Sequence, residues 1–357
     1  MNADFLGDLQ TPALVLSLEA LDTNIRTMAT ARPDATLRPH VKAHKCTGIA
    51  RRQVAAGHRS FTCATPLEVI GMARAGVGND LLLANECVDT RRLAAMATAE
   101  RETGIMVTVA VDSPITVDLA ADAGLRHVLI DVNVGLPRCG CAPDAARSIA
   151  ERAVGRGLIV RGVMGYEGHL MTAPENDKPS KVEECMRLLI RAFDSVVDVA
   201  GDECRIISAG GTGTYHVFDR HDPVLGRVNE VQAGSYALMD SSYGAQPLPF
   251  EQALYVVGTV ISTTSGERGS WAVIDVGLKS LGMDHGNPHI DGANVWFCSD
   301  EHTTFSMVDG PLPRVDDRVL VRPAHIDPTI AMHTAIHVVP RWGEAVIDVW
   351  PVDLRHW

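Results

Sequence analysis

The stretch from residue 38 to residue 45 reads Arg38-Pro39-His40-Val41-Lys42-Ala43-His44-Lys45. A short apolar run at 35–37 precedes it, and Ile49, Ala50 and Val54 follow it at helical spacing. This pattern predicts that a strand ends and a helix begins close to the basic octet. In a parallel barrel, such strand-to-helix junctions present the catalytic side chains. The alternative interpretation is a solvated or phosphate-binding basic surface.

The same unit, a short apolar run followed by an amphipathic segment, recurs along the next 200 or so residues. Strands buried on both faces by crossover helices read as continuous apolar runs, as these do. No GxGxxG follows the first strand to favour an open doubly wound sheet. We therefore predict an α/β fold, a (β/α)8 TIM-type barrel over residues 13–238. Its strands are expected at 35–41, 60–64, 80–84, 105–111, 127–132, 158–164, 205–209 and 228–232, and its helices near 46–57, 66–76, 88–102, 114–124, 143–157 and 179–201.

After about residue 240 the pattern changes to period-2 runs broken by Gly, Pro and Asp, such as 254–261 and 345–352. No long helical pattern remains in this part of the sequence. We therefore predict a mostly β domain over residues 239–357, joined by the lead-in residues 1–12.

Composition limits the possible functions. The chain has 357 residues and a net charge of −12, which argues against a general nucleic-acid-binding protein. No apolar run is long enough to span a membrane, and no signal-peptide pattern opens the chain, so we expect a cytoplasmic protein. The eight cysteines are scattered and show neither CxxC pairs nor zinc-finger spacing. A disulfide framework is therefore not expected.

Two basic residues fall at predicted strand ends. Lys42 is flanked by other cations, which favour the neutral amine that a Schiff-base lysine needs. The alternative is a substrate-binding cation. Arg138 comes just beyond the fifth predicted strand and suits a phenolate or carboxylate partner, unless it pairs with an acid of its own loop.

Three loops after later strands carry further candidates. Gly165-Tyr166-Glu167-Gly168-His169 follows the sixth strand; Tyr166 could stack on or bond to a cofactor, and His169 could act as a general base. Glycines and hydroxyls follow the seventh strand at 208–214 and the eighth at 232–236. Phosphate sites of such barrels are often built after these two strands, so a phosphate-bearing ligand is favoured over ordinary turns.

His325 and Asp327 lie in the sequence Pro323-Ala324-His325-Ile326-Asp327-Pro328. If this segment is a strand, residues two apart point to the same side and could hold one cation. Imidazole and carboxylate suit Mn²⁺, Zn²⁺ or Mg²⁺. Chance is the alternative, because HxD is a common pattern. The polar cluster Asp284-His285 could support such a site or simply form a turn.

Together these motifs resemble the fold-type III pyridoxal phosphate enzymes, the alanine racemase superfamily, and within it the D-threonine aldolase and D-serine dehydratase branch. The resemblance runs over nearly the whole chain. Its most specific pieces are the octet 38–45, Gly165-Tyr-Glu-Gly-His169, Ser208-Ala-Gly-Gly-Thr212 and Pro323-Ala-His325-Ile-Asp327-Pro.

The resemblance implies a role for each matching residue. Lys42 matches the lysine of the internal aldimine, and Arg138 matches the arginine on the pyridoxal phenolic oxygen. Tyr166 and His169 match positions near the reacting carbon. His325 and Asp327 match the metal pair of this branch, where dehydratases typically carry His and Cys and D-threonine aldolases carry His and Asp. The remaining cofactor positions are Ser208, Gly211, Thr212, Gly234 and Ser235 around the phosphate, and Gln232, a neutral amide where racemases place an arginine against the pyridine nitrogen.

The resemblance therefore predicts a pyridoxal 5'-phosphate- and divalent-metal-dependent lyase that splits D-β-hydroxy-α-amino acids into glycine and an aldehyde. The first alternative is dehydration of D-serine or D-threo-3-hydroxyaspartate to a 2-oxo acid and ammonia. A racemase is disfavoured because no Tyr lies between residue 256 and the C-terminus. A non-catalytic pyridoxal phosphate-binding protein and a cofactor-free metal hydrolase are further alternatives. The family implies a homodimer that takes a small-molecule substrate.

Overall fold

A parallel sheet of seven strands is the centre of one of two units in the computed structural model, which describes residues 6–267 and 269–356. This barrel unit comprises residues 28–42, 49–234 and the chain from 354 onward. Its strands pair in sequence order and every pair is parallel, as the predicted barrel requires. The strands are β2 (Ser60–Cys63), β3 (Asp80–Leu83), β4 (Met106–Val111), β5 (His127–Asp131), β6 (Ile159–Met164), β7 (Ile206–Ala209) and β8 (Glu230–Val231).

The prediction of a continuous strand at 35–41 is wrong. A 3₁₀ turn, η2 (Asp34–Thr36), is followed by two isolated parallel bridges, Leu37 with Val231 and His40 with Thr62. The proline between them lacks an N–H, so it cannot donate to a continuous ladder. The segment nevertheless contacts β8 on one side and β2 on the other, so it occupies the place of the first barrel strand.

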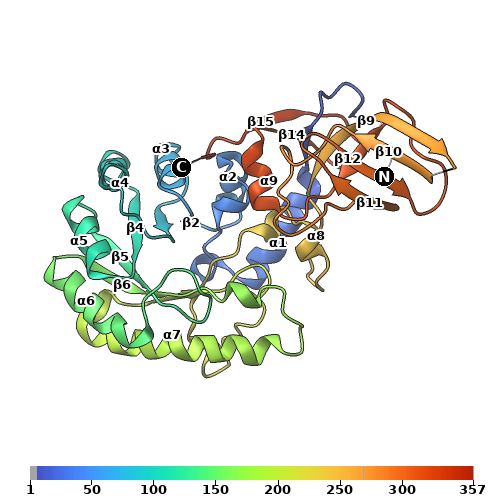
Figure 1. Ribbon diagram of the computed structural model, residues 1–357. Helices are drawn as coiled ribbons and strands as arrows, with labels where there is room; N and C mark the ends of the chain where they lie inside the picture. Colours follow the sequence, from blue (N-terminus) through green and yellow to red (C-terminus); the bar gives the residue numbers. More distant parts are fainter. Residues whose placement is uncertain (1–5, 268, 357) are drawn as a thin grey trace. The chain divides into compact units, whose positions relative to one another are not determined.

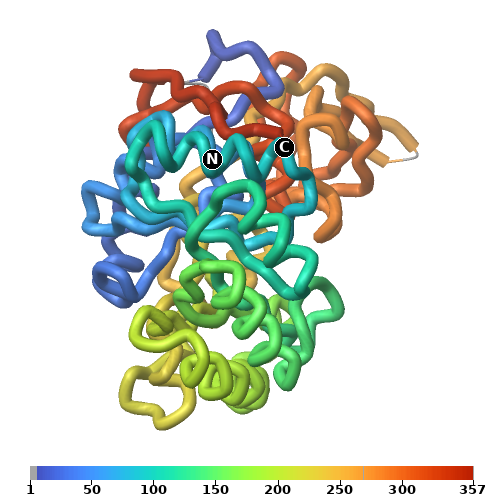
Figure 2. The backbone as a smooth tube through the Cα atoms, turned by 90° about the vertical axis from the view of Figure 1, so that its left-hand side faces the viewer, coloured from blue at the N-terminus to red at the C-terminus, as the bar shows by residue number. Residues whose placement is uncertain are grey.

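Helices connect the strands and lie outside the parallel sheet (Figures 1 and 2). Their starts follow local sequence rules. At α3, for example, the Thr65 hydroxyl accepts a hydrogen bond from the Glu68 N–H (3.2 Å), and Pro66 occupies the first turn. These helices are α2 (Thr47–Ala55), α3 (Pro66–Arg74), α4 (Thr90–Thr103), α5 (Pro114–Asp122), α6 (Ala146–Gly155) and α7 (Lys178–Ala200). Most of α1 (Leu18–Ala31) belongs to the second unit.

A charged network fills part of the barrel interior. The fully buried Arg38 contacts Asp80 Oδ2 through Nη2 and Glu230 Oε2 through Nε, both at 2.9 Å. Arg161 also contacts Asp80 (2.8 Å). Burial alone would raise the pKa of Asp80, but the two arginines outweigh it and hold that pKa well below its ordinary value. Each buried charge thus has a partner, as its burial requires.

The second unit, called the β unit, comprises the chain up to residue 27, 43–48 and 235–353. Its mixed sheet has the order β11-β12-β10-β9-β1-β14-β15, with β13 also paired to β9. The predicted barrel range of 13–238 included β1, which here pairs with β9 and β14. The strands are β1 (Ala13–Ser17), β9 (Leu254–Gly266), β10 (Gly269–Ile274), β11 (Ala293–Cys298), β12 (Thr303–Met307), β13 (Arg318–Val321), β14 (Ala335–Val339) and β15 (Asp348–Pro351).

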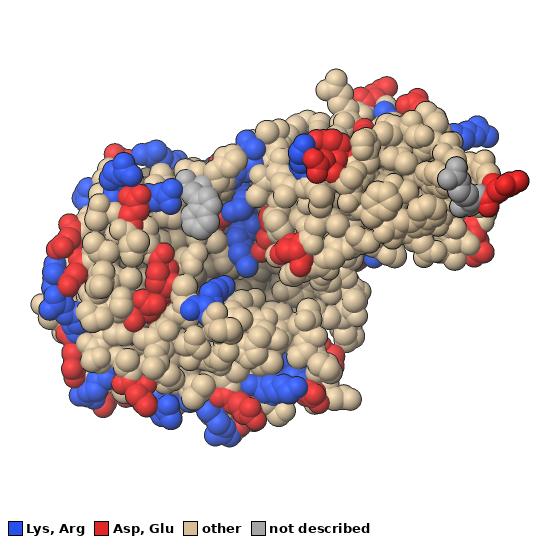
Figure 3. All heavy atoms as spheres, in the orientation of Figure 1, with Lys and Arg blue, Asp and Glu red and all other residues tan. Residues whose placement is uncertain are grey.

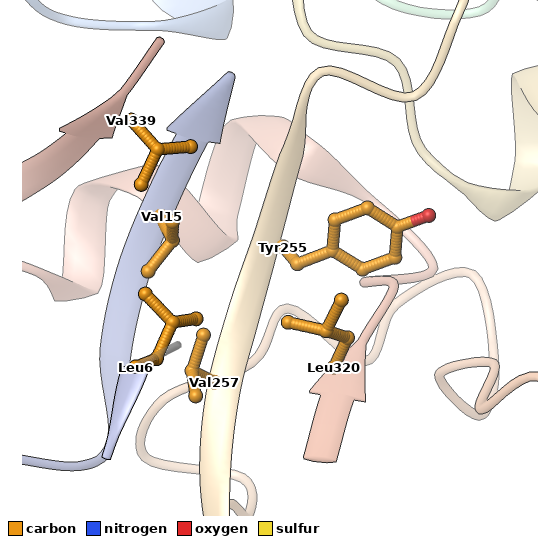
Figure 4. Packing of buried hydrophobic residues seen from close by; sticks show 6 residues of the cluster. All are labelled: Leu6, Val15, Tyr255, Val257, Leu320 and Val339. Atoms are coloured by element: carbon orange, nitrogen blue, oxygen red, sulfur yellow. The ribbon is translucent and has the colours of Figure 1, made fainter. Parts of the chain in front are cut away.

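An apolar cluster holds the β unit together. Strands β1, β9, β13 and β14 contribute buried side chains that pack with one residue of the N-terminal segment (Figure 4). Burying each such side chain contributes about 1.5–3 kcal/mol. The cluster consists of Leu6, Val15, Tyr255, Val257, Leu320 and Val339.

Two short helices interrupt the β unit, α8 (Ser241–Gly244) and α9 (Ile326–Met332). The strand geometry considered for His325 and Asp327 is wrong, because α9 begins at Ile326. The buried carboxylate of Asp240 explains the local fold: Oδ1 accepts from the Tyr243 N–H (2.9 Å) and Oδ2 from the Ile326 N–H (3.0 Å). One acid therefore caps the starts of both helices.

The surface carries charges of both signs. On the face of the barrel unit that Figure 3 displays, Lys and Arg side chains lie among Asp and Glu side chains.

Within the described residues, no helix is long and apolar enough to cross a membrane.

Candidate active site

Lys42 lies in the 3₁₀ turn η3 (Val41–Ala43), directly after the segment that occupies the place of the first barrel strand. Its side chain is half-buried. The Lys42 N–H points to His40 Nδ1 at 3.4 Å, and His40 in turn forms a bridge to Thr62 of β2. Lys42 therefore lies just after the carboxyl end of the segment that replaces the first strand. In parallel barrels, reacting groups are presented at this end of the strands.

The loops after β5 and β6 bring three of the predicted residues together. The Arg138 guanidinium carbon lies 5.3 Å from the centre of the Tyr166 ring, a cation–π contact. His169, exposed in the turn η5 (Gly168–Leu170), approaches the β5 loop at Gly135, where an added Cβ would lie 3.2 Å from the imidazole Cε1. A cation, an aromatic ring and an imidazole thus line one part of the barrel unit.

Glu167 anchors the loop after β7, a role that the sequence pattern did not reveal. Its buried carboxylate accepts hydrogen bonds from the Gly210 N–H (3.2 Å) and the Thr214 hydroxyl (2.7 Å), both in the loop after β7. The Thr214 oxygen also accepts from the Gly211 N–H (3.1 Å). Burial raises the pKa of Glu167. The only sequence signal was an acid among glycines, and that does not distinguish an anchor from a reacting group.

The glycine-rich loop after β7 is closely packed. A Cβ on Gly213 would lie 2.2 Å from the backbone oxygen of Met171, so no larger residue fits there. The buried Lys178 ammonium donates to the Gly213 oxygen at 2.9 Å. Thr212 is buried in the same turn. This loop therefore has the tight backbone that an anion cradle needs.

Ser208 and Gln232 belong to a hydrogen-bonded chain inside the barrel. The Gln232 amide nitrogen donates to the Ser208 hydroxyl (2.9 Å), and that hydroxyl donates to Glu230 Oε1 (2.7 Å). The Thr62 hydroxyl donates to the Gln232 amide oxygen (3.1 Å). Since Glu230 also binds Arg38, the orientation of the Gln232 amide depends on the charged network.

The remaining two predicted phosphate residues adjoin in sequence. Gly234 follows β8 in the barrel unit, and Ser235 begins the turn η8 (Ser235–Ala237) in the β unit. The backbone oxygen of Ser235 accepts from the Met239 N–H at 2.8 Å.

An acidic pair near Arg138 was also missed. Asp131 ends β5 and is buried. Burial and the neighbouring carboxylate of Glu86 raise the pKa of Asp131 well above its ordinary value, and the charge of Arg138 opposes this rise. The charge of Arg138 thus acts on Asp131 at the end of β5, while its guanidinium contacts the Tyr166 ring.

The predicted metal pair lies at the start of α9. His325 is the residue before the helix and Asp327 is in its first turn, so the strand argument for this pair was wrong. The turn still brings the His325 Nε2 to 3.8 Å from Asp327 Oδ2. Both side chains are mostly buried, at 20% and 13% exposure. Burial would lower the pKa of His325, but the carboxylates of Asp327 and Asp284 outweigh it and raise that pKa.

Asp284 and His285, for which the sequence left open a supporting role or an ordinary turn, lie beside His325. Asp284 Oδ2 lies 2.7 Å from the His325 Nδ1, and the His285 ring stacks on the His325 ring at 4.0 Å between centres. Ligand atoms of Asp284, His285 and His325 lie within 4.8 Å of one another. These groups therefore surround the His325 ring, which supplies the imidazole of the predicted metal pair.

Comparison with known proteins places these features in context. Residues 16–242 match the family described as alanine racemase, N-terminal domain, and residues 253–339 match a family described as a serine dehydratase domain. The chain is 33% identical to a D-threonine aldolase of Arthrobacter sp over 369 residues, covering 99% of this chain and 94% of that protein. It is 30% identical to a D-threo-3-hydroxyaspartate dehydratase of Delftia sp. (strain HT23), covering 79% and 75%. The crystal structure of D-threonine aldolase from Filomicrobium marinum superimposes with a TM-score of 0.89 at 31% identity, covering 98% of this chain and 97% of that one.

Proposed function

Since the chain belongs to the alanine racemase N-terminal domain family, we propose that it is a lyase that cleaves D-β-hydroxy-α-amino acids between Cα and Cβ. The products are glycine and an aldehyde, as the resemblance to D-threonine aldolases implies. The similarity to an aldolase over nearly the full length of both chains supports this carbon–carbon lyase.

The residues of the barrel unit fit pyridoxal 5'-phosphate. Bound there, the cofactor would supply the electron sink that holds the electron pair of the broken bond. Lys42 offers a half-buried amine for its attachment, and Arg138 offers a cation for its phenolic oxygen. Gln232 would meet the ring nitrogen with an amide whose orientation Ser208 and Thr62 fix. The phosphate would be held by Gly211, Thr212 and Gly234, with the adjoining Ser235. Ser208 was also predicted there, but its one hydroxyl proton goes to Glu230, so it supports Gln232 instead.

His325 and Asp327 would hold the divalent metal, Mn²⁺, Mg²⁺ or Zn²⁺, that the family implies. The fit rests on donor chemistry: a ring nitrogen and a carboxylate oxygen 3.8 Å apart, on side chains mostly shielded from solvent. Such a cation would act as a Lewis acid on the β-hydroxyl of the substrate.

His169 would remove the β-hydroxyl proton, since it is an exposed imidazole in the loop that also carries Tyr166. The Cα–Cβ bond then breaks, the oxygen becomes that of the aldehyde, and the electron pair remains at Cα. Addition of a proton at Cα completes glycine. Tyr166 keeps Arg138 in place through the cation–π contact.

One observation carries the choice of cleavage over dehydration: the partner of His325 is a carboxylate, Asp327, rather than a thiolate. In the enzyme branch that this chain resembles, members with a His and Asp pair catalyse aldol cleavage. Dehydration to a 2-oxo acid and ammonia is the second candidate, because the dehydratase of Delftia sp. covers most of this chain. We further propose a cytoplasmic homodimer, as the family implies.

Product analysis tests the proposal. The purified protein, supplied with pyridoxal phosphate and Mn²⁺, is incubated with D-threonine, and glycine, acetaldehyde, 2-oxo acid and ammonia are measured separately. We expect equal amounts of glycine and acetaldehyde, and no products from L-threonine. A 2-oxo acid with ammonia in place of glycine would overturn cleavage in favour of dehydration.

A further inference from the structure

Asp284 contacts the ring nitrogen of His325 that faces away from Asp327. Its Oδ2 lies 2.7 Å from Nδ1, whereas Asp327 Oδ2 lies 3.8 Å from Nε2. A carboxylate can only accept a hydrogen bond, so the Nδ1 beside Asp284 must carry the proton. In neutral imidazole this leaves the lone pair on Nε2, on the side of Asp327. Asp284 and a metal ion therefore require different nitrogens of His325.

The loop that carries Asp284 is built against the start of α9. Gly282 forms an antiparallel bridge with His325, and the Gly282 N–H donates to the Thr329 hydroxyl at 2.9 Å. That hydroxyl donates to the His325 backbone oxygen at 2.7 Å. A Cβ on Gly282 would lie 2.2 Å from Pro328 Cγ, so only glycine allows this approach. The position of Asp284 beside His325 thus has a structural cause.

His285 cannot share an ion with His325 in this arrangement. The two rings are parallel within 3° and their centres are 4.0 Å apart. Ring lone pairs lie in the ring plane, so an ion in the plane of His325 would lie far out of the plane of His285. His325 and Asp327 can therefore bind the ion. Asp284 contacts the ring nitrogen of His325 that is remote from the ion, and His285 stacks on the His325 ring.

We propose that Asp284 is a positioning residue that fixes the proton of His325 on Nδ1 and so directs Nε2 toward the metal ion. This inference rests on the proposed function, because that function supplies the metal. Outer carboxylates on ligating histidines orient the ring and raise its basicity, and their loss typically lowers metal affinity 10–100-fold. Asp284 is 55% exposed, so its replacement is not expected to disturb folding.

Calorimetric titration of the metal-free protein with Mn²⁺ provides the first test. We expect Asp284→Ala to weaken Mn²⁺ binding about 10–100-fold. Asp284→Asn keeps an acceptor for the Nδ1–H and should lose less. The matched control is Asp291→Asn, which alters another exposed Asp beside a His of the same unit, with His289 Nε2 at 3.2 Å. This control should bind Mn²⁺ as the wild type does.

Nitrogen NMR of ¹⁵N-histidine-labelled protein provides a signature that a general structural defect would not produce. In the metal-free wild type, neutral His325 should be protonated on Nδ1, and in Asp284→Ala it should shift toward the Nε2–H form. The His325→Ala spectrum identifies the signal. Protonation on Nε2 in the wild type, or unchanged Mn²⁺ affinity in Asp284→Ala, would overturn the inference. If the wild type binds no Mn²⁺ at all, the metal dependence of the proposed function is wrong instead.

Discussion

Removing the hydroxyl of Ser208 should lower the stability of the barrel unit and leave the Gln232 side chain less well oriented. Ser208 is fully buried, donates to Glu230 and accepts from Gln232. A hydrogen bond to a charged group contributes about 1.5–3 kcal/mol and a neutral one about 1 kcal/mol. Ser208→Ala should therefore lower the free energy of unfolding by about 2.5–4 kcal/mol, a large part of the roughly 5–15 kcal/mol of a typical protein.

Two optical probes separate the units in a urea titration. Most helices lie in the barrel unit, so circular dichroism at 222 nm reports mainly on that unit. Four of the five tryptophans (271, 296, 342 and 350) lie in the β unit, and the fifth is beyond the described residues. Intrinsic fluorescence thus reports mainly on the β unit. We expect Ser208→Ala to shift the dichroism transition to lower urea.

Ser195→Ala is the matched control. The Ser195 hydroxyl donates only to the Ala192 backbone oxygen of its own helix, α7 (2.7 Å), so its loss should change the free energy of unfolding by about 0.5 kcal/mol or less. With Ser208→Ala, the absorbance spectrum of added pyridoxal phosphate should also change, because Gln232 loses a partner. If Ser208→Ala costs no more than Ser195→Ala, the hydrogen-bonded chain described above is wrong.

Three further changes test other parts of the barrel unit. Lys42→Ala should abolish covalent attachment of pyridoxal phosphate: after borohydride reduction, mass spectrometry should find the added pyridoxyl group on the wild type alone, and its presence on the variant would contradict the role of Lys42. Asp80→Asn should cost about 3–5 kcal/mol at neutral pH, because it removes one partner of a buried ion pair. The folded-state pKa of Asp80 is lowered, so its contribution is present above its ordinary pKa and is lost as the pH falls; the difference between wild type and variant in urea titrations should therefore shrink in acid, and a constant difference would contradict the pairing. Glu167→Ala should weaken binding of pyridoxal phosphate about tenfold to thirtyfold in equilibrium dialysis, since two hydrogen bonds to the loop after β7 are lost, at about 1 kcal/mol each. Pyridoxal, which lacks the phosphate, is the control ligand and should bind both proteins equally.

Hydrophobic periodicity was sufficient to predict the order of the barrel elements. Helices predicted at 66–76 and 114–124 are found at Pro66–Arg74 and Pro114–Asp122, because proline and polar capping residues mark their starts. The segment 35–41 was predicted as a strand from its composition. Its proline and its two separate partners instead give isolated bridges, and one of those partners, Val231 in β8, lies far away in sequence.

The candidate site residues of the barrel were predicted because they lie in loops that directly follow strands. This rule needs only the order of elements in the sequence. What sequence order could not reveal is which polar groups are buried together. Glu167 contacts a loop more than forty residues later, and Asp284 meets His325 only through the bridge at Gly282. The spacing of His325 and Asp327 suggested a pair, but the pair forms through a helical turn rather than a strand.

The irregular segment at 37–40 has a consequence for the order in which the chain can fold. It closes the ring through Leu37, which must meet Val231 of β8, the last barrel strand to be synthesised. During translation the backbone at Leu37 therefore has no partner strand until β8 is made, and an unpaired edge can pair with other chains. Closure between such distant segments is slow, because the entropy of the long loop must be overcome first. We therefore expect chaperone dependence and aggregation of nascent chains to be greatest before residue 231 leaves the ribosome.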